Sequence, residues 1–480
     1  MPALARVSKV ISTILCKYRP ATLPISRRYT ESATSNPPSK HLNENLKSLD
    51  DVPIVGIQGA PLMINKLLST WLTLRSDLLK NHELTGEYAT KYGKMYRNSL
   101  LTFDMIVLSD PKLIQDFFRQ EKMYPVRMPF PYWLEHRRTN NEPLGIILQS
   151  GEQWHRSRSA MSRRLLQPQE ISLFLNSMHG VSTDVFERLK SLRPKEGPNK
   201  DIVPNLEEEL FRWAFEYNKL KELAEKAANN SNEQVDDDSY LAYLVAQNKL
   251  SEEEIYGNMT ELLSAAVDTT SITTLWTLYC LAKNPDCQER LYEEVTRVLP
   301  EGITPTKEHY NQMSYLKAVM QETQRLYPIQ PLLSRNVTED MNLNGYIIPA
   351  GMTILLNMYS VSRDPEYFED PLIFKPERWL NRVKGESLNH FLMLPFGFGV
   401  RSCIGRRMAE QKMHTLLPMY AYVCIYLIGE EFKQVCLKEV GLPKQIIRNF
   451  QVVIDKEVDA VSQIILAPDQ ALDLRLVDRH

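Results

Sequence analysis

The segment Phe396–Gly405, which reads FGFGVRSCIG, constrains the fold of this chain most, because it places three glycines and an arginine around one cysteine. Pro395 and the glycines at 397 and 399 disfavour a helix up to Val400. The helix-forming run IGRRMAEQKMHTLL follows directly. Cys403 is therefore expected at or just before the N-terminus of a helix, where the dipole and free N–H groups favour a thiolate.

A cysteine in this setting suits a metal ligand beneath a large flat cofactor. Glycine lets the backbone approach such a group closely and brings N–H groups toward the sulfur. Arg401 lies two residues before Cys403, where it can pair with an anionic substituent. A thiolate ligand to haem iron would use all of these features. The alternative is a structural cysteine in a glycine-rich turn. A lone cysteine would favour this alternative, but the full spacing F-x-x-G-x-R-x-C-x-G is highly specific.

Four other motifs accompany this loop. They are Trp154-His155-Arg156-Ser157-Arg158, Ala265-Ala266-Val267-Asp268-Thr269-Thr270, Glu322-Thr323-Gln324-Arg325 and Pro376-Glu377-Arg378-Trp379. With FGFGVRSCIG they follow the order found in the cytochrome P-450 monooxygenases, and the chain resembles that family from about residue 50 to its end. The resemblance implies one haem domain over 51–480, a haem iron bound by Cys403, and a haem-binding loop that includes Phe396 and Gly405.

The hydrophobic pattern predicts a mainly α fold with a small β region. Residues 60–330 are mainly helical in pattern, with a long helix over 251–284 whose apolar middle indicates burial. After Pro328 the pattern alternates, and Asn344–Gly345 is a strong hairpin signal.

Composition argues against several other classes of protein. A net charge of −2 gives no reason to expect a nucleic-acid partner. The six cysteines are scattered without a C-x-x-C pair, so neither a disulfide framework nor a structural zinc site is indicated. No run of roughly 18 apolar residues occurs, so no transmembrane helix is expected, and any membrane association would be peripheral.

The first thirty residues differ from the rest of the chain. They contain six Lys or Arg residues and no acidic residue before Glu31. This composition is typical of an organelle transit peptide over 1–30, followed by a polar linker over 31–50; the alternative is a disordered basic tail. Together with the resemblance, it predicts a mitochondrial protein on the matrix side of the inner membrane.

Asp268 and Thr269 are the predicted catalytic residues. They lie in the apolar middle of the long helix, where a charge is costly unless it is paired or has a catalytic function. The Thr269 hydroxyl can bond to the carbonyl of Ala265 and loosen the helix locally. The resemblance implies that the two residues deliver protons to dioxygen. Taken alone, this segment would more often be a helix-packing stretch.

The resemblance assigns further roles to charged side chains. Glu322 and Arg325 share a helix face and, with Arg378, are expected to form a buried ion-pair network of structural rather than catalytic importance. Arginine suits carboxylates because its guanidinium is bidentate and always charged. The family's donors to the haem propionates correspond to Trp154, Arg158, Arg335 and Arg401.

Arg406 and Arg407 fall in the first turn of the helix after Cys403, where cations are unfavourable by roughly 0.3–1 kcal/mol each. Binding to a partner protein explains the two arginines better than a contribution to helix stability does. They resemble the contacts by which the mitochondrial branch of the family binds an iron–sulfur ferredoxin, and Lys317 matches another such position. Gln321 stands where that branch often has a second lysine.

Two stretches depart from the family pattern. Several tens of residues are missing between Trp154 and Asp268, with the expected junction near 216–217, and the missing part would include the helices that roof the substrate cavity. Residues 416–447 are an expected insertion, in which Pro418 would break or kink the helix.

The sequence therefore predicts a monooxygenase that inserts one atom of dioxygen into a hydrophobic substrate, such as a sterol, a steroid or a related lipid. Two alternatives are a haem-binding protein without turnover, because the cavity roof is incomplete, and an unstable isoform without function. The residues that would select the substrate are largely the missing ones.

Overall fold

The computed structural model describes residues 46–478 with gaps, of which 217–239 and 427–449 are the longest. The predicted transit peptide and most of the predicted linker lie outside the described residues. From Lys47 onward the chain forms one unit.

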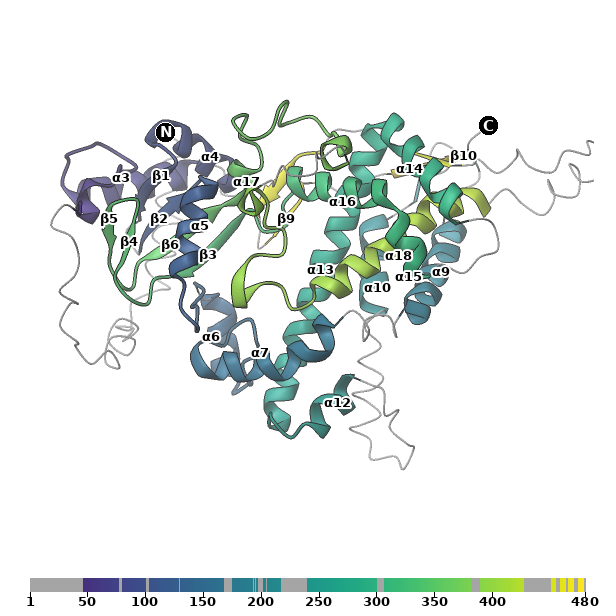
Figure 1. The fold of residues 1–480 in the computed structure, drawn as a ribbon, viewed down its shortest axis with the longest axis horizontal. Coiled ribbons are helices and arrows are strands. Elements are labelled where there is room, and N and C mark those ends of the chain that lie inside the picture. Colours follow the sequence, from purple (N-terminus) through teal and green to yellow (C-terminus); the bar gives the residue numbers. More distant parts are fainter. Residues whose placement is uncertain are drawn as a thin grey trace, which may run out of the picture. The chain divides into compact units, whose positions relative to one another are not determined.

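Helices form most of the described chain (Figure 1). The helices are α3 (Leu62–Arg75), α4 (Asn81–Tyr92), α5 (Pro111–Gln120), α6 (Pro131–Thr139), α7 (Gly151–Leu166), α9 (Leu175–Leu192), α10 (Leu206–Glu216), α12 (Tyr240–Ala246), α13 (Glu252–Lys283), α14 (Pro285–Val298), α15 (Lys307–Gln312), α16 (Ser314–Leu326), α17 (Met358–Val361) and α18 (Arg406–Tyr426). The strands are β1 (Met95–Ser99), β2 (Asp104–Leu108), β3 (Leu332–Asn336), β4 (Met341–Leu343), β5 (Tyr346–Ile348), β6 (Thr353–Asn357), β7 (Phe450–Ile454), β8 (Ala460–Ser462), β9 (Leu466–Pro468) and β10 (Leu474–Asp478). The predicted fold class, mainly α with a small β region, is confirmed.

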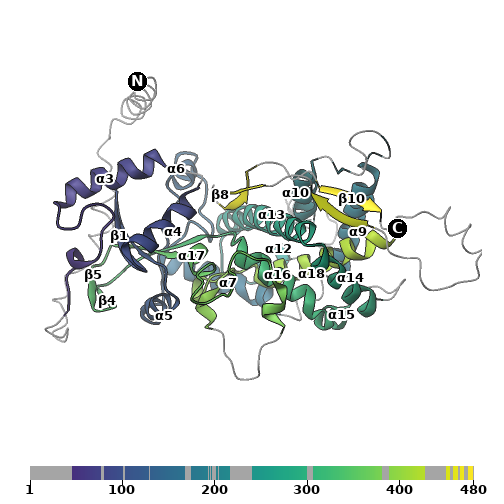
Figure 2. The same ribbon diagram turned by 90° about the horizontal axis from the view of Figure 1, so that it is seen from above.

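The largest sheet has the strand order β1-β2-β6-β3, with β2 and β6 parallel and the other pairs antiparallel. Helices α3 and α4 pack beside β1 (Figure 2). Asn344 and Gly345 connect β4 to β5 with φ angles of +55° and +81°, which is the left-handed conformation that the predicted hairpin turn requires. Strand β3 matters for the site because it carries Arg335 in register with Ile354 of β6.

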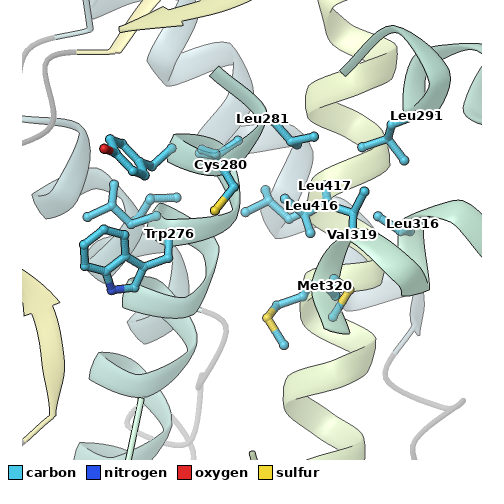
Figure 3. Close-up of a cluster of buried hydrophobic side chains, with 14 of the residues drawn as sticks. Trp276, Cys280, Leu281, Leu291, Leu316, Val319, Met320, Leu416 and Leu417 are labelled. Atoms are coloured by element: carbon cyan, nitrogen blue, oxygen red, sulfur yellow. The ribbon is translucent and has the colours of Figure 1, made fainter. Parts of the chain in front are cut away.

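The long helix α13 organises the helical part of the molecule. It begins with a capping box, in which Ser251 and Glu254 bond to each other's backbone N–H groups. Every residue from Thr270 to Ala282 is buried, because α10, α16 and α18 pack around this half of the helix. Figure 3 shows Cys280 and Leu281 of α13 facing side chains of α14, α16 and α18, while Trp276 points to the other side of α13. This packing fixes α13 relative to the segment that contains Cys403.

Helix α18 runs from Arg406 to Tyr426 with Pro418 inside it, so the expected break at Pro418 is wrong. Leu416, Leu417 and Pro418 are buried, and their packing in the core maintains the helix despite the missing N–H donor. The rest of the predicted insertion, residues 427–447, lies outside the described residues, and α10 ends at Glu216, next to the predicted deletion near 216–217. Within the described ranges, none of the helices combines the length and apolar character needed to cross a bilayer.

Candidate functional site

The loop around Cys403 has an unusual backbone that its glycines permit. Gly397 and Gly399 have φ angles of +69° and +71°, which L-residues with side chains rarely adopt. The turn folds back so that the N–H of Cys403 donates to the carbonyl of Phe396 at 2.8 Å. Gly405 lies beside the sulfur, and a Cβ there would be at an ordinary van der Waals distance of 4.0 Å from Sγ. The loop therefore presents one thiol ahead of α18.

The Cys403 side chain has accessible surface, yet its thiol is surrounded by protein. The two observations agree if the thiol faces an internal space rather than open solvent. Burial raises its pKa, against the opposing effects of the Gly405 N–H, Arg158 and Arg127. The helix terminus alone therefore does not yield the expected thiolate, and a bound metal ion is what would deprotonate the thiol.

Arg401 is held in place by backbone carbonyl groups and an aromatic ring. It is 2% exposed, and its guanidinium carbon lies 3.8 Å from the ring centroid of Trp154. It donates to the carbonyl oxygens of Pro125 (3.0 Å), Ile146 (3.4 Å) and Gln149 (2.9 Å). The predicted residues Trp154 and Arg401 thus form one unit.

Three more arginines surround Arg401. Burial and the neighbouring Arg127, Arg335 and Arg158 lower the pKa of Arg401 to about 9, and burial lowers that of Arg127 to about 10. Arg335 donates from Nε to Glu121 Oε1 at 2.6 Å. Among the residues that the structure describes, Glu121 is the only carboxylate that pairs with any of these four guanidinium groups. We call Arg127, Arg158, Arg335 and Arg401 the arginine cluster.

The arginine cluster carries more positive charge than the described protein neutralises. Buried charges are costly unless they are paired. Haem brings two propionate carboxylates, and arginine binds carboxylates well. The residues around Cys403 therefore fit a haem, with the thiol as the iron ligand and the arginine cluster and Trp154 as the propionate side.

The predicted catalytic residues lie on α13. Thr269 Oγ1 donates to the carbonyl oxygen of Ala265 at 2.6 Å, the bond that its position in the helix predicts. Asp268 is exposed rather than buried, so the expected deep position of this carboxylate is wrong. Ser264, one helical turn earlier, is also exposed, because the neighbouring helices cover the half of α13 that begins at Thr270. Partial desolvation still raises the pKa of Asp268.

Glu322 is fully buried and is the centre of a hydrogen-bonded network. It accepts hydrogen bonds from Arg325 (2.7 and 2.9 Å), Arg378 (3.0 Å), the Lys375 N–H (3.0 Å) and the Trp379 ring N–H (2.8 Å). Burial raises the pKa of Glu322, but these donors outweigh it and leave the pKa below its usual value. Arg325 also donates to the carbonyl groups of Ser362, Pro371 and Ile373. The structure thus brings the three predicted side chains together.

The predicted partner-binding cations lie at the surface or near it. Arg406 is exposed and pairs with Glu410 at 2.9 Å, one turn along α18. Arg407 is exposed, and Lys317 is half-buried with its ammonium donating to the carbonyl of Asn311 at 2.9 Å. Phe398 and Val400, at the tip of the cysteine loop, are 40% and 48% exposed.

Sequence reasoning missed two residues of this site, Glu121 and Arg127. Both lie in the stretch EKMYPVR between α5 and α6, which has no recognisable motif. Arg127 donates to the carbonyl oxygen of Arg401, so only the folded chain brings it to the loop. The only feature of the sequence that could have indicated these two residues is the presence of charges on both sides of the apolar residues in this stretch.

Comparison with known proteins gives two results. The family model of cytochrome P450 matches residues 65–217 and 200–420. Mitochondrial sterol 26-hydroxylase of Rattus norvegicus is 30% identical, over 96% of this chain and 94% of the relative. Mitochondrial 1,25-dihydroxyvitamin D(3) 24-hydroxylase of the same species is 32% identical, over 74% and 80%, and cytochrome P450 10 of Lymnaea stagnalis is 32% identical, over 76% and 78%. The alignment with the sterol 26-hydroxylase spans 538 residues, more than the 480 of this chain, so the relative contains residues without a counterpart here.

Proposed function

Because the chain belongs to the cytochrome P450 family and is a P450 monooxygenase by that membership, we propose that it hydroxylates a sterol, a steroid or a related lipid in the mitochondrion. The proposed electron donor is an iron–sulfur ferredoxin. The substrate class and the compartment are those that the names of the relatives give.

The observation that carries this proposal is the arginine cluster beside Cys403. Four guanidinium groups face one protein carboxylate. Arg127, Arg158, Arg335 and Arg401 would bind the propionates with Trp154, while Cys403 would bind the iron. When bound, haem supplies the activation of dioxygen, and the protein supplies the ligand, protons and substrate pocket.

Proton delivery is assigned to two adjacent residues of α13. Asp268 is exposed, so its carboxyl group can exchange protons with solvent. The Thr269 hydroxyl donates to the carbonyl of Ala265 in this structure. Rotation of the side chain would let Oγ1 hold a proton for dioxygen instead.

The proposed ferredoxin surface is the outer side of the cysteine loop and the start of α18. Arg406 and Arg407 are exposed there, and Lys317 is the third proposed cation. A positive rim would attract an acidic donor and speed its association. The pairing of Arg406 with Glu410 weakens this attraction at one position.

Peripheral attachment to the inner membrane, on the matrix side, is assigned to α3. Met63, Leu67 and Trp71 follow one another at four-residue spacing and are 62%, 54% and 51% exposed, and Ile64 beside them is 49% exposed. An apolar helical face of this kind favours the interface of a bilayer.

A second candidate function, haem binding without turnover, is favoured by the open side of α13. We propose that family helices are absent at the junction near 216–217, and the two pieces of the family match meet there, at 200–217. Exposed Ser264 and Asp268 are consistent with an incomplete roof.

The absorption spectrum of the reduced, CO-bound protein tests thiolate-bound haem. A red-shifted CO band is expected, and its absence in haem-loaded protein would contradict the proposal. Consumption of NADPH coupled to a hydroxylated sterol, with ferredoxin and its reductase present, separates the first candidate from the second.

A further inference from the structure

Glu121 occupies a position that the roles described so far do not explain. It is the residue directly after α5, where its N–H closes the helix by donating to the carbonyl of Phe118. Its Oε1 accepts from Arg335 Nε at 2.6 Å, and the two side chains are 9% and 4% exposed. A Cβ at Gly399 would lie 3.0 Å from Oε2. One carboxylate therefore pairs with a member of the arginine cluster and lies close to the cysteine loop at Gly399.

The chain after Glu121 is bonded to the same two elements. The N–H of Asn336, next to Arg335 on β3, donates to the carbonyl of Val126 at 2.8 Å. Arg401 Nε donates to the carbonyl of Pro125 at 3.0 Å. Glu121 thus begins a short segment that joins β3 to the cysteine loop, and its charge is fixed relative to both.

The pairing with Glu121 orients Arg335 but leaves some of its hydrogen-bond donors unused. A guanidinium group has five N–H donors. Among contacts with described residues, Arg335 uses one for Glu121 and one for the carbonyl of Ser334. The remaining three can bind another carboxylate while Glu121 keeps the planar group in place.

We propose that Glu121 is a positioning residue that fixes Arg335 for a haem propionate and lowers the reduction potential of the bound haem. The inference rests on the proposed haem site. A fixed negative charge beside the propionates opposes the arrival of an electron at the iron, and local charge is one of the levers by which a protein sets such a potential. Among the residues that the structure describes, Glu121 is the carboxylate that pairs with the arginine cluster and so supplies this negative charge.

The first test measures the midpoint potential of the haem in Glu121→Gln. The amide retains an acceptor for Arg335 but removes the charge, so the potential is expected to become more positive. Glu209→Gln is the matched control, because Glu209 is also buried and also pairs with an arginine, Arg188, in a different part of the helical region. An unchanged potential in Glu121→Gln, or an equal shift in both variants, would overturn the proposal.

The second test works without haem and so does not depend on the proposed function. A cavity of about 330 Å³ is lined by Glu121, Arg335 and Pro125 and is large enough to admit acetate. Glu121→Ala should lower the melting temperature of the haem-free chain, and acetate should restore it. Sodium chloride at equal ionic strength should not restore the melting temperature of Glu121→Ala. Neither salt should raise the melting temperature of the parent chain by the same amount.

Equal effects of acetate and chloride on Glu121→Ala would reject a site for one carboxylate beside Arg335. If Glu121→Gln fails to retain haem, the acetate experiment decides alone. If the parent chain itself binds no haem, the proposed function fails. The acetate experiment would still test the carboxylate site beside Arg335, because it uses the haem-free chain.

Discussion

Two groups of buried and half-buried arginines in this molecule differ in charge balance. In the Glu322 network, two arginines share one carboxylate, but ring and backbone N–H groups and several carbonyls satisfy every member. In the arginine cluster, only Arg335 of the four arginines pairs with a described carboxylate, Glu121, and Arg401 relies on three neutral carbonyl groups. The first group is complete within the protein, whereas we propose that a ligand completes the second. A structural role and a binding role can therefore be distinguished by asking which charges remain unbalanced.

Removing the centre of the complete network should have the largest effect. Glu322→Gln leaves Arg325 buried without its counter-ion, which typically costs about 3–5 kcal/mol of unfolding free energy. Chemical denaturation of the haem-free chain measures this loss. Glu377→Gln, which removes a partly exposed partner of Arg290 nearby, should cost less than about 1 kcal/mol. Equal losses in the two variants would contradict the central position of Glu322.

Cys403→His should abolish the thiolate character of the bound haem, because neutral imidazole cannot donate comparable charge to iron. The red-shifted CO band should disappear, while the haem-free chain keeps its unfolding free energy. Cys287→Ser, at a half-buried position on α14, should retain the band. A band that survives in Cys403→His would show that another residue is the ligand.

Arg158→Gln should produce the opposite pattern to Glu322→Gln. Taking one cation from the unbalanced cluster should leave the haem-free chain as stable as the parent or slightly more stable. Loss of a charge-assisted hydrogen bond to a propionate should weaken haem binding by roughly 10- to 100-fold. Haem transfer kinetics and thermal unfolding measure the two quantities.

Arg156→Gln is the matched control for Arg158, because Arg156 lies on the same helix and is exposed, with a salt bridge to Glu254. Its haem affinity should equal that of the parent. If Arg158→Gln instead destabilised the haem-free chain and left haem affinity unchanged, the cluster would be a structural feature like the Glu322 network.

Thr269→Ala should leave haem content intact and divert reducing equivalents into hydrogen peroxide. A positioned proton donor typically contributes at least about 100-fold, so a loss of coupling of roughly 10-fold or more is expected. Thr273→Ala removes the same kind of bond one turn later, at 2.7 Å to the carbonyl of Thr269, and should leave coupling unchanged. The ratio of product to NADPH consumed distinguishes the variants.

The sequence predicted best what local chemistry determines. The long helix α13 with its apolar middle, the Asn344–Gly345 turn and the loop glycines all follow from residue type and spacing. The family was predictable because F-x-x-G-x-R-x-C-x-G is specific. The side chains of Glu322, Arg325 and Arg378 meet as the resemblance implied.

Long-range packing limited the prediction elsewhere. Glu121 and Arg127 reach the site through β3 and the cysteine loop, which no local pattern reveals. The depth of Asp268 was misjudged, because an apolar helix does not indicate which of its turns other helices cover. The helix through Pro418 was missed because burial of Leu416 and Leu417 overrides a local propensity.

The smallest expected effect concerns the start of α18, where we propose that exposed charges serve a partner rather than a cofactor. Replacing both Arg406 and Arg407 with Gln should slow reduction by a mitochondrial-type ferredoxin by roughly threefold to tenfold at low salt, and less at high salt, where screening is stronger. Haem content and melting temperature should hold or rise slightly, because cations at the start of α18 oppose the helix dipole. Arg212→Gln, an exposed arginine on α10, is the control. The competing explanation is that Arg406 serves only its pair with Glu410. In that case the double variant would lose stability, and its reduction rate per haem would match the parent at every ionic strength.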